Sequence, residues 1–241
     1  MSKLAKLQKA LESQKFRGEV YEIGNSQSSH DRDLVVIHTC KPEERLDSDL
    51  KMTKLLKTVF GRSTRIFRDL PFDDYTDNQL IHFLSYLVPS NVPISHILEE
   101  EFPFVVRSYF SNYSLIYGKD RGKQYHRLAE TAIKKNPHVT MEYIDFAIMQ
   151  IYDTALNPRI PLVLLNTLIS ANRYAVRVLK ELKQEFNLTF FNQSDAQEIT
   201  QLISKIHNKS LSTSTYSKYI SQQQELARKL LRKLISAKKK F

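Results

Sequence analysis

Residues 160–171 read Ile-Pro-Leu-Val-Leu-Leu-Asn-Thr-Leu-Ile-Ser-Ala and form the most apolar stretch of the chain. Pro161 suits the first turn of a helix, and a helix over 161–186 would carry apolar side chains on nearly every side of its first turns. Other elements must cover such a helix, so we expect Leu165 and Leu168 to lie in the interior. Because the stretch falls short of the roughly 20 apolar residues that cross a bilayer, we expect no membrane span.

The segments around this stretch also carry helix signals. Thr76 and Gln79 have the spacing of a capping box, as do Ser194 and Gln197, and prolines open or close several segments. These signals predict helices over 80–88, 94–102, 103–117, 123–135, 141–156, 161–186, 194–207 and 215–238. Short connections favour antiparallel neighbours. The sequence therefore predicts a mainly α fold, either an irregular helical bundle or a short solenoid of helix pairs.

The N-terminal part of the chain carries the strand signals. We expect a helix over 2–16, short strands over 19–23 and 34–39, and a helix that begins at Asp47 or Ser48 and ends at Gly61. With 5 glycines in 241 residues, tight hairpin turns lack their usual material, so we expect at most a minor N-terminal β-hairpin. The predicted organisation has a basic amphipathic helix, a small mixed region, a helical body and a basic C-terminal helix with a tail, over 1–18, 19–75, 76–208 and 209–241.

Positive charge is concentrated at the two ends of the chain, which has a formal net charge of +10. Residues 1–18 carry five cations against one acid, and residues 205–241 carry ten cations against one acid. The remaining residues are slightly acidic. Such ends favour an anionic partner, which is nucleic acid, an acidic protein surface or an anionic membrane. The other interpretation is that they serve solubility or a nuclear address.

The predicted last helix is amphipathic, with apolar and basic residues on opposite faces. The apolar stripe requires a groove on the chain's own body or on a partner, and we assign partner docking to Leu226, Leu230, Leu231 and Leu234. The basic face predicts contacts to nucleic-acid phosphates through Arg228, Lys229, Arg232 and Lys233, followed by Lys238, Lys239 and Lys240. The alternatives are a solvated surface helix and a helix lying on a membrane.

A second basic cluster includes Lys51 and is interleaved with Phe60 and Phe67. Arginine binds phosphate in a bidentate manner and aromatic rings stack on unpaired bases. The cluster therefore predicts nucleic-acid contacts through Lys54, Lys57, Arg62, Arg65 and Arg68. The alternative is that it neutralises residues 69–101, which hold seven acids and neither Lys nor Arg.

A third basic segment, residues 118–127, resembles a phosphate-binding loop only superficially. The spacing between Gly118 and Gly122 is too short, and Gln124 stands where a magnesium-binding hydroxyl is needed. We therefore expect no nucleotide hydrolysis here. The segment still predicts an anion contact at a helix N-terminus, through Lys119, Arg121 and Lys123, although an exposed turn between helices is the alternative.

The sequence offers little for catalysis. His38 and Cys40 share one predicted strand face, but no third group is seen to orient the histidine. The His and Cys residues lack metal-ligand spacing, and Asp49 with Lys51 only loosely resembles a nuclease site because it falls at a helix start. We expect no enzyme, no cofactor and no small-molecule substrate.

Together these features predict a non-enzymatic helical subunit of a nuclear or nucleolar assembly that docks on other protein subunits and contacts DNA or RNA through its basic ends. One alternative is a pure protein-interaction scaffold for an acidic partner. The other is a mitochondrial nucleic-acid- or ribosome-associated protein, because the N-terminal helix is cationic and amphipathic. The N-terminal residues lack the apolar run of a secretory signal, so we expect an intracellular protein.

Overall fold

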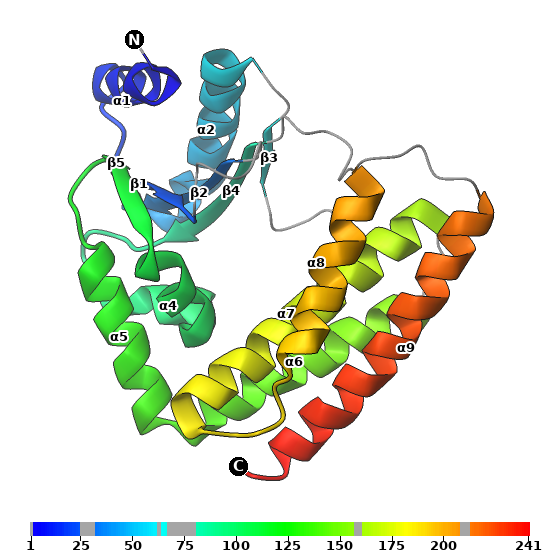
Figure 1. Cartoon of the computed structure of the whole chain (residues 1–241). Helices are drawn as coiled ribbons and strands as arrows, with labels where there is room; N and C mark the ends of the chain where they lie inside the picture. Colours follow the sequence, from blue (N-terminus) through cyan, green and yellow to red (C-terminus); the bar gives the residue numbers. More distant parts are fainter. Residues whose placement is uncertain (1, 25–31, 62–63, 67–80, 157–160, 208–212) are drawn as a thin grey trace. The chain divides into compact units, whose positions relative to one another are not determined.

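A computed structural model describes residues 2–24, 32–61, 64–66, 81–156, 161–207 and 213–241 (Figure 1). The described residues form two compact units that divide between Lys135 and Asn136. This division falls inside the predicted helical body. Unit 1 denotes the described residues up to 135, and unit 2 denotes the described residues from 136 to 241.

Unit 1 is built on a mixed sheet with strand order β3-β4-β2-β1-β5. Its strands are β1 (Gly18–Ile23), β2 (Arg32–His38), β3 (Thr64–Ile66), β4 (Ile81–Leu87) and β5 (Tyr113–Tyr117). β4 pairs in parallel with both β2 and β3, while β1 pairs antiparallel with β2 and β5. β1 and β2 are thus the predicted hairpin, which belongs to a larger sheet than expected.

Helices cover both faces of this sheet. Successive side chains along each strand point to opposite faces, and apolar side chains on both faces are buried under helices. Leu34, Val36 and Phe83 face α1 (Lys3–Ser13) and α2 (Arg45–Phe60). Val35 and Ile37 face the opposite layer, which contains α3 (Ile97–Glu100), α4 (Pro103–Ser111) and α5 (Gly122–Lys135). Short 3-10 turns, η1 (Pro42–Glu44) and η2 (Ile94–His96), precede α2 and α3.

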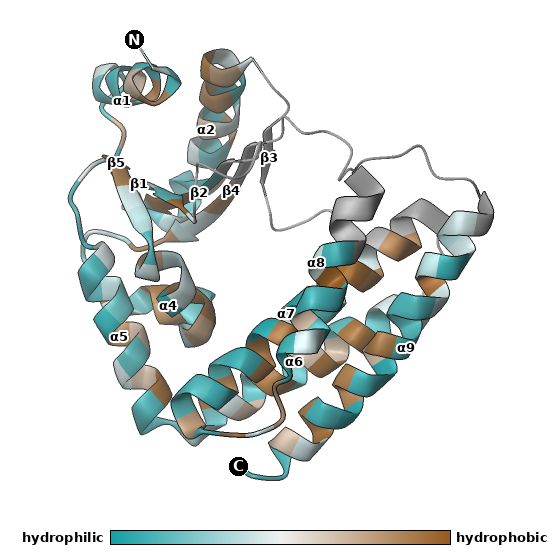
Figure 2. Cartoon of the chain, in the orientation of Figure 1, coloured by the Kyte–Doolittle hydropathy of each residue, from teal (hydrophilic) through white to brown (hydrophobic). Residues whose placement is uncertain are grey.

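Unit 2 is all-helical within the described residues and contains α6 (Pro137–Leu156), α7 (Pro161–Phe186), α8 (Gln193–His207) and α9 (Thr213–Lys238). α7 packs against each of the other three helices, and Leu165 and Leu168 are buried as predicted. Hydrophobic and hydrophilic residues are interspersed along the coloured parts of these helices (Figure 2). Buried Asn172 of α7 donates to the backbone and side-chain oxygens of Gln223 in α9, at 3.0 and 2.9 Å. This polar contact fixes how α7 and α9 align.

The prediction of a mainly α chain with a minor β part is confirmed. The predicted helix over 80–88 is wrong, because its residues 81–87 form β4, and the predicted helix over 103–117 is wrong at its end, which is β5. A parallel strand covered on both faces has a continuous apolar sequence that resembles a short buried helix. α2 begins at Arg45, earlier than predicted, and ends as predicted at Gly61, whose φ of 66° permits the left-handed turn that ends the helix. The predicted capping box at Thr76 lies outside the described residues.

Candidate functional site

The apolar stripe of α9 belongs to the core of unit 2. Leu226, Leu230 and Leu234 are buried where α9 packs on α7 and α6, and Leu231 is half-buried beside them. The predicted docking of a partner on these four leucines is therefore wrong: the groove that the stripe requires is supplied by the chain's own helices. Sequence periodicity identifies such a stripe but not the surface that it meets.

The basic side of α9 is divided between an inner and an outer set. Lys229 and Lys233 each place Nζ 2.5 Å from a carboxylate oxygen of Asp195 in α8. Asp195 is only 1% exposed. Burial opposes its ionisation, but the hydrogen bonds from the two lysines outweigh that cost and hold the pKa of Asp195 below its ordinary value. We therefore remove Lys229 and Lys233 from the predicted phosphate contacts.

The outer set of α9 consists of exposed side chains. Arg228 and Arg232 are four residues apart and lie on one outward face. Lys239 and Lys240, beyond the helix, are also exposed. Lys238 instead binds Asp145 of α6, with Nζ 2.5 and 2.7 Å from its two carboxylate oxygens.

α7 carries a basic row that the sequence analysis missed. Arg173, Arg177 and Lys180 are exposed, and their spacing of four and three residues places them along one edge of the helix. The signal was available in the sequence: these cations recur with helical periodicity in an otherwise apolar segment.

In unit 1, the predicted anion loop is held by a buried carboxylate. Glu19 of β1 is 2% exposed and forms an ion pair with the Arg121 guanidinium. The hydroxyls of Tyr21 and Tyr125 also donate to Glu19, at 2.8 and 3.2 Å. Because the Arg121 charge is already neutralised, we remove it from the predicted phosphate contacts. Lys119 and Lys123 are exposed on the same segment.

Gly118 allows the start of this loop to approach β1 closely. Its φ is 91°, and a Cβ atom there would lie 2.4 Å from the carbonyl oxygen of Gly18. Burial raises the pKa of both Tyr21 and Tyr125, and the Glu19 charge raises them further. Both phenols therefore remain hydrogen-bond donors to the carboxylate. The loop is a structural junction and not a phosphate cradle.

The second basic cluster is described only in part. Lys51, Lys54 and Lys57 are exposed on α2, as a phosphate-binding role requires. Phe60 is 4% exposed and packs in the core, so it cannot stack on a base. Arg62, Phe67 and Arg68 lie outside the described residues, and Arg65 in β3 is described by its backbone alone.

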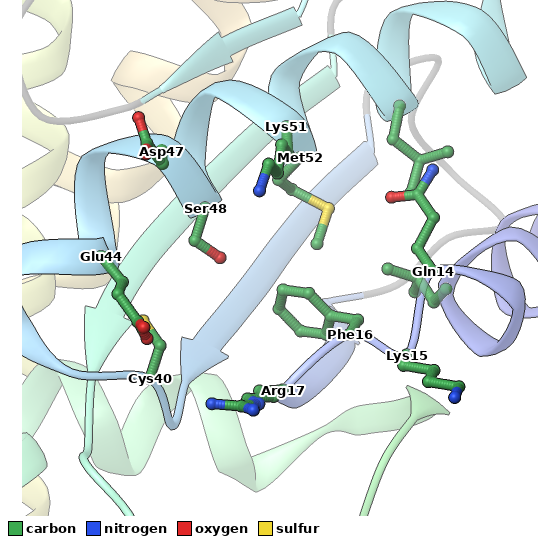
Figure 3. A pocket seen from close by; sticks show the side chains of 12 residues that line it. Gln14, Lys15, Phe16, Arg17, Cys40, Glu44, Asp47, Ser48, Lys51 and Met52 are labelled. Atoms are coloured by element: carbon green, nitrogen blue, oxygen red, sulfur yellow. The ribbon is translucent and has the colours of Figure 1, made fainter.

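A pocket of about 390 Å³ lies between the end of α1 and the first half of α2 (Figure 3). α1 ends because Lys15 adopts a left-handed conformation with φ 49°, and the Phe16 amide then donates to Leu11. This turn brings Phe16 against the pocket, where its ring lies edge-on to His38 and Tyr117 at centroid distances of 5.4 and 5.9 Å. Sequence alone could not place Phe16 beside α2.

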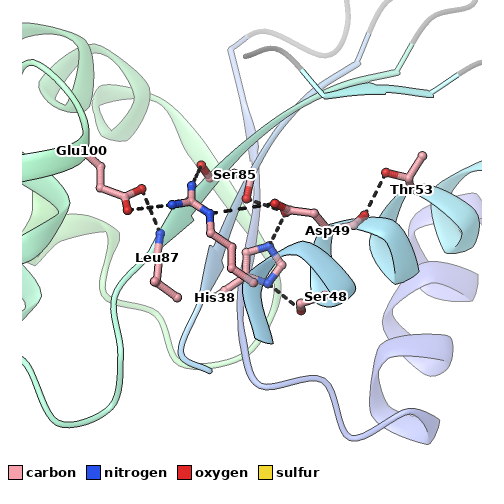
Figure 4. Close-up of polar contacts among 8 residues, drawn as sticks. His38, Ser48, Asp49, Thr53, Ser85, Leu87 and Glu100 are labelled. Atoms are coloured by element: carbon pink, nitrogen blue, oxygen red, sulfur yellow. Dashed lines mark hydrogen bonds and ion pairs between the residues drawn. The ribbon is translucent and has the colours of Figure 1, made fainter. Parts of the chain in front are cut away.

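Behind the pocket, His38 connects β2 to α2 (Figure 4). His38 is fully buried, with Nδ1 2.8 Å from the Ser48 hydroxyl and Nε2 2.9 Å from Asp49 Oδ1. The hydroxyl of Ser85 in β4 also donates to Asp49, at 2.5 Å. Burial disfavours the charged carboxylate, but the contacts to His38 and Ser85 hold the pKa of Asp49 below its ordinary value.

Arg45 extends this network to α3. Its guanidinium donates to Glu100 and to the carbonyl oxygen of Ser85, both at 2.8 Å. The network therefore links β2, β4, α2 and α3. It also supplies the third group that the sequence analysis did not find: the Asp49 carboxylate lies at one nitrogen of His38, and the pocket-lining Ser48 hydroxyl lies at the other.

Within the described ranges, no group of three or more His, Cys, Asp or Glu residues has the arrangement of a metal site. None of the helices there is long and apolar enough to cross a bilayer. Comparison with models of known protein families finds no match. No curated protein matches the chain, and no solved structure does.

Proposed function

We propose that the chain is a non-enzymatic subunit of a nuclear, or nucleolar, protein–nucleic acid assembly and that it contacts DNA or RNA phosphates through outward-facing cations. The observation that carries this proposal is the division of the basic residues into two sets. Arg121, Lys229 and Lys233 bind buried carboxylates, while Lys51, Lys54 and Lys57 remain exposed. In unit 2 the exposed set includes Arg173, Arg177, Lys180, Lys183, Lys218, Arg228, Arg232, Lys239 and Lys240.

The outward set suits a phosphate backbone better than an isolated anion. Its members lie in rows along α2, α7 and α9, and DNA and RNA present rows of phosphates. Arg228 and Arg232 also supply planar guanidinium groups, which bind phosphate with two parallel hydrogen bonds. The nuclear location is proposed from the cationic ends, which have the composition of a nuclear address.

Salt-dependent binding tests this proposal. The whole chain should bind labelled DNA or RNA with an affinity that falls steeply as salt rises, because each neutralised phosphate releases counterions. Replacing Arg173, Arg177 and Lys180 by Gln should lower the magnitude of the log–log salt slope by about 0.9 for each lost duplex contact. Lys238→Gln is the matched control, since Lys238 already pairs with Asp145. Affinity that is independent of salt would contradict the proposal.

A second candidate function is favoured by one observation, the placement of Ser48 and Asp49 at the two nitrogens of His38, at 2.8 and 2.9 Å. A hydroxyl, an imidazole and a carboxylate in this order resemble the arrangement of a serine-dependent acyl hydrolase. A fluorophosphonate probe distinguishes the candidates. Selective labelling of Ser48, lost in Ser48→Ala and absent from exposed Ser13, would support the hydrolase. An unlabelled Ser48 would support the non-enzymatic proposal.

A further inference from the structure

The pocket between α1 and α2 lies beside the exposed cations of α2. Its apolar lining includes Leu11, Met52 and Leu55, and the Phe16 ring lies near its centre (Figure 3). Its volume of about 390 Å³ is at the lower end of the roughly 300–1,000 Å³ found for small-molecule sites. The pocket therefore suits a single planar group with a polar attachment.

Three exposed cations line the same pocket. Lys15 and Arg17 come from the segment after α1, and Lys51 comes from α2. Lys54 follows Lys51 by nearly one helical turn and is also exposed. An aromatic ring surrounded by cations is the combination that binds single-stranded nucleic acids, because bases stack on the ring while phosphates meet the charges.

We propose that this pocket takes one unpaired nucleotide of a single strand, with its base against Phe16 and its phosphates on Lys15, Arg17 and Lys51. This inference rests on the proposed function and adds that the nucleic acid bound at this surface is single-stranded. A paired base is stacked and hydrogen-bonded inside a duplex and must be extruded before it enters a pocket.

The polar wall of the pocket indicates which bases fit. The Ser48 hydroxyl lies 2.8 Å from His38 Nδ1 and also lines the pocket. Because a hydroxyl oxygen has two lone pairs, Ser48 keeps an acceptor position for a group in the pocket whether it donates to or accepts from the imidazole. Glu44 and Asp47 add carboxylate acceptors to the same lining. A wall rich in acceptors favours a base with an exocyclic amino group, which cytosine has and thymine lacks.

Four oligonucleotides test this inference with the full chain at one salt concentration. Single-stranded dC12 should bind more tightly than an abasic 12-mer with the same phosphates. Base–aromatic stacking predicts a difference of about 5- to 140-fold. The chain should also bind dC12 more tightly than it binds dT12 or a 12-base-pair duplex. Equal affinity for dC12 and the abasic strand would overturn the pocket, and equal affinity for dC12 and dT12 would overturn the acceptor wall.

Two variants assign the effect to the pocket. Phe16→Leu keeps apolar volume but removes the aromatic ring, so the ratio of dC12 to abasic affinity should fall toward one while abasic binding stays unchanged. Phe191→Leu, in unit 2, is the matched control and should leave the ratio unchanged. If Phe16→Leu unfolds, Ser48→Ala gives the second readout, a reduced ratio of dC12 to dT12 affinity. An unchanged ratio in either folded variant would overturn the inference.

The failure of this inference differs from failure of the proposed function. Steep salt dependence with equal affinities for dC12, the abasic strand and the duplex would remove the pocket and keep the phosphate-binding function. Weak binding of all four that is insensitive to salt would contradict both.

Discussion

Glu19 in unit 1 and Asp195 in unit 2 are the most deeply buried carboxylates of the described residues, and they are compensated by different chemistry. Glu19 in unit 1 is held by one arginine and two tyrosine hydroxyls, whereas Asp195 in unit 2 is held by two lysines. Both need partners because an isolated buried charge is costly. The comparison shows that some basic residues of a cationic segment neutralise buried acids inside the fold, and that the acid beside each one decides whether its charge is available to a partner.

The strongest test of this comparison concerns Arg121, the cation beside Glu19. Arg121→Met leaves a buried carboxylate with tyrosine donors alone, and breaking a buried pair in this way costs about 3–5 kcal/mol. Chemical denaturation of the full chain measures the loss. Lys123→Met, two residues away and exposed, should change stability by less than about 0.5 kcal/mol. Similar small changes in both variants would show that the tyrosines suffice to hold Glu19.

Acid titration sharpens the unit 2 side of the comparison. The pKa of Asp195 is lowered in the folded chain, so its stabilisation is present above the unfolded-state value of about 3.9 and is lost as pH falls through the lower folded value. Asp195→Asn should therefore flatten the fall in unfolding free energy below about pH 5. The pKa of Asp49 in unit 1 is also lowered, so part of the fall in unfolding free energy at low pH should persist in Asp195→Asn. An unaltered acid profile would contradict the ion-pair assignment.

The smallest effect is expected at Lys238, whose ion pair with Asp145 is exposed on both sides. Exposed pairs contribute about 0–1 kcal/mol because water screens them and two long side chains must be ordered. Lys238→Ala should therefore shift the unfolding free energy by less than about 1 kcal/mol. A larger loss would mean that this pair anchors the end of α9.

Local patterns in the sequence were sufficient for much of unit 2. The apolar periodicity around Leu165 predicts a buried helix face, and this face is buried. The stripe of Leu226, Leu230 and Leu234 predicts a covered face, but not that the chain's own helices cover it. The same patterns were ambiguous for β4, because a short apolar run fits a covered strand and a buried helix equally well. Strand pairing is decided by distant residues, which local periodicity does not contain.

The site depends on contacts between elements, which the sequence pattern does not specify. Lys229 and Lys233 read as a solvated basic face until α8 places Asp195 beside them. His38 reads as a lone histidine until the turn after β2 brings Ser48 and Asp49 to its two nitrogens. The exposure of Lys54 and Lys57 could be predicted from the sequence alone, because the apolar residues around them on α2 have helical spacing and occupy the opposite face.

Two double variants on α9 test the division between inner and outer cations most directly. Arg228→Gln/Arg232→Gln and Lys229→Gln/Lys233→Gln remove the same charge from adjacent positions of one helix. The outer pair should lower the salt slope of duplex binding by up to about 1.8 and change stability by less than about 0.5 kcal/mol. The inner pair should cost about 3–5 kcal/mol and leave the slope of the folded chain unchanged. The reverse pattern, or equal effects of the two pairs on both quantities, would contradict the division.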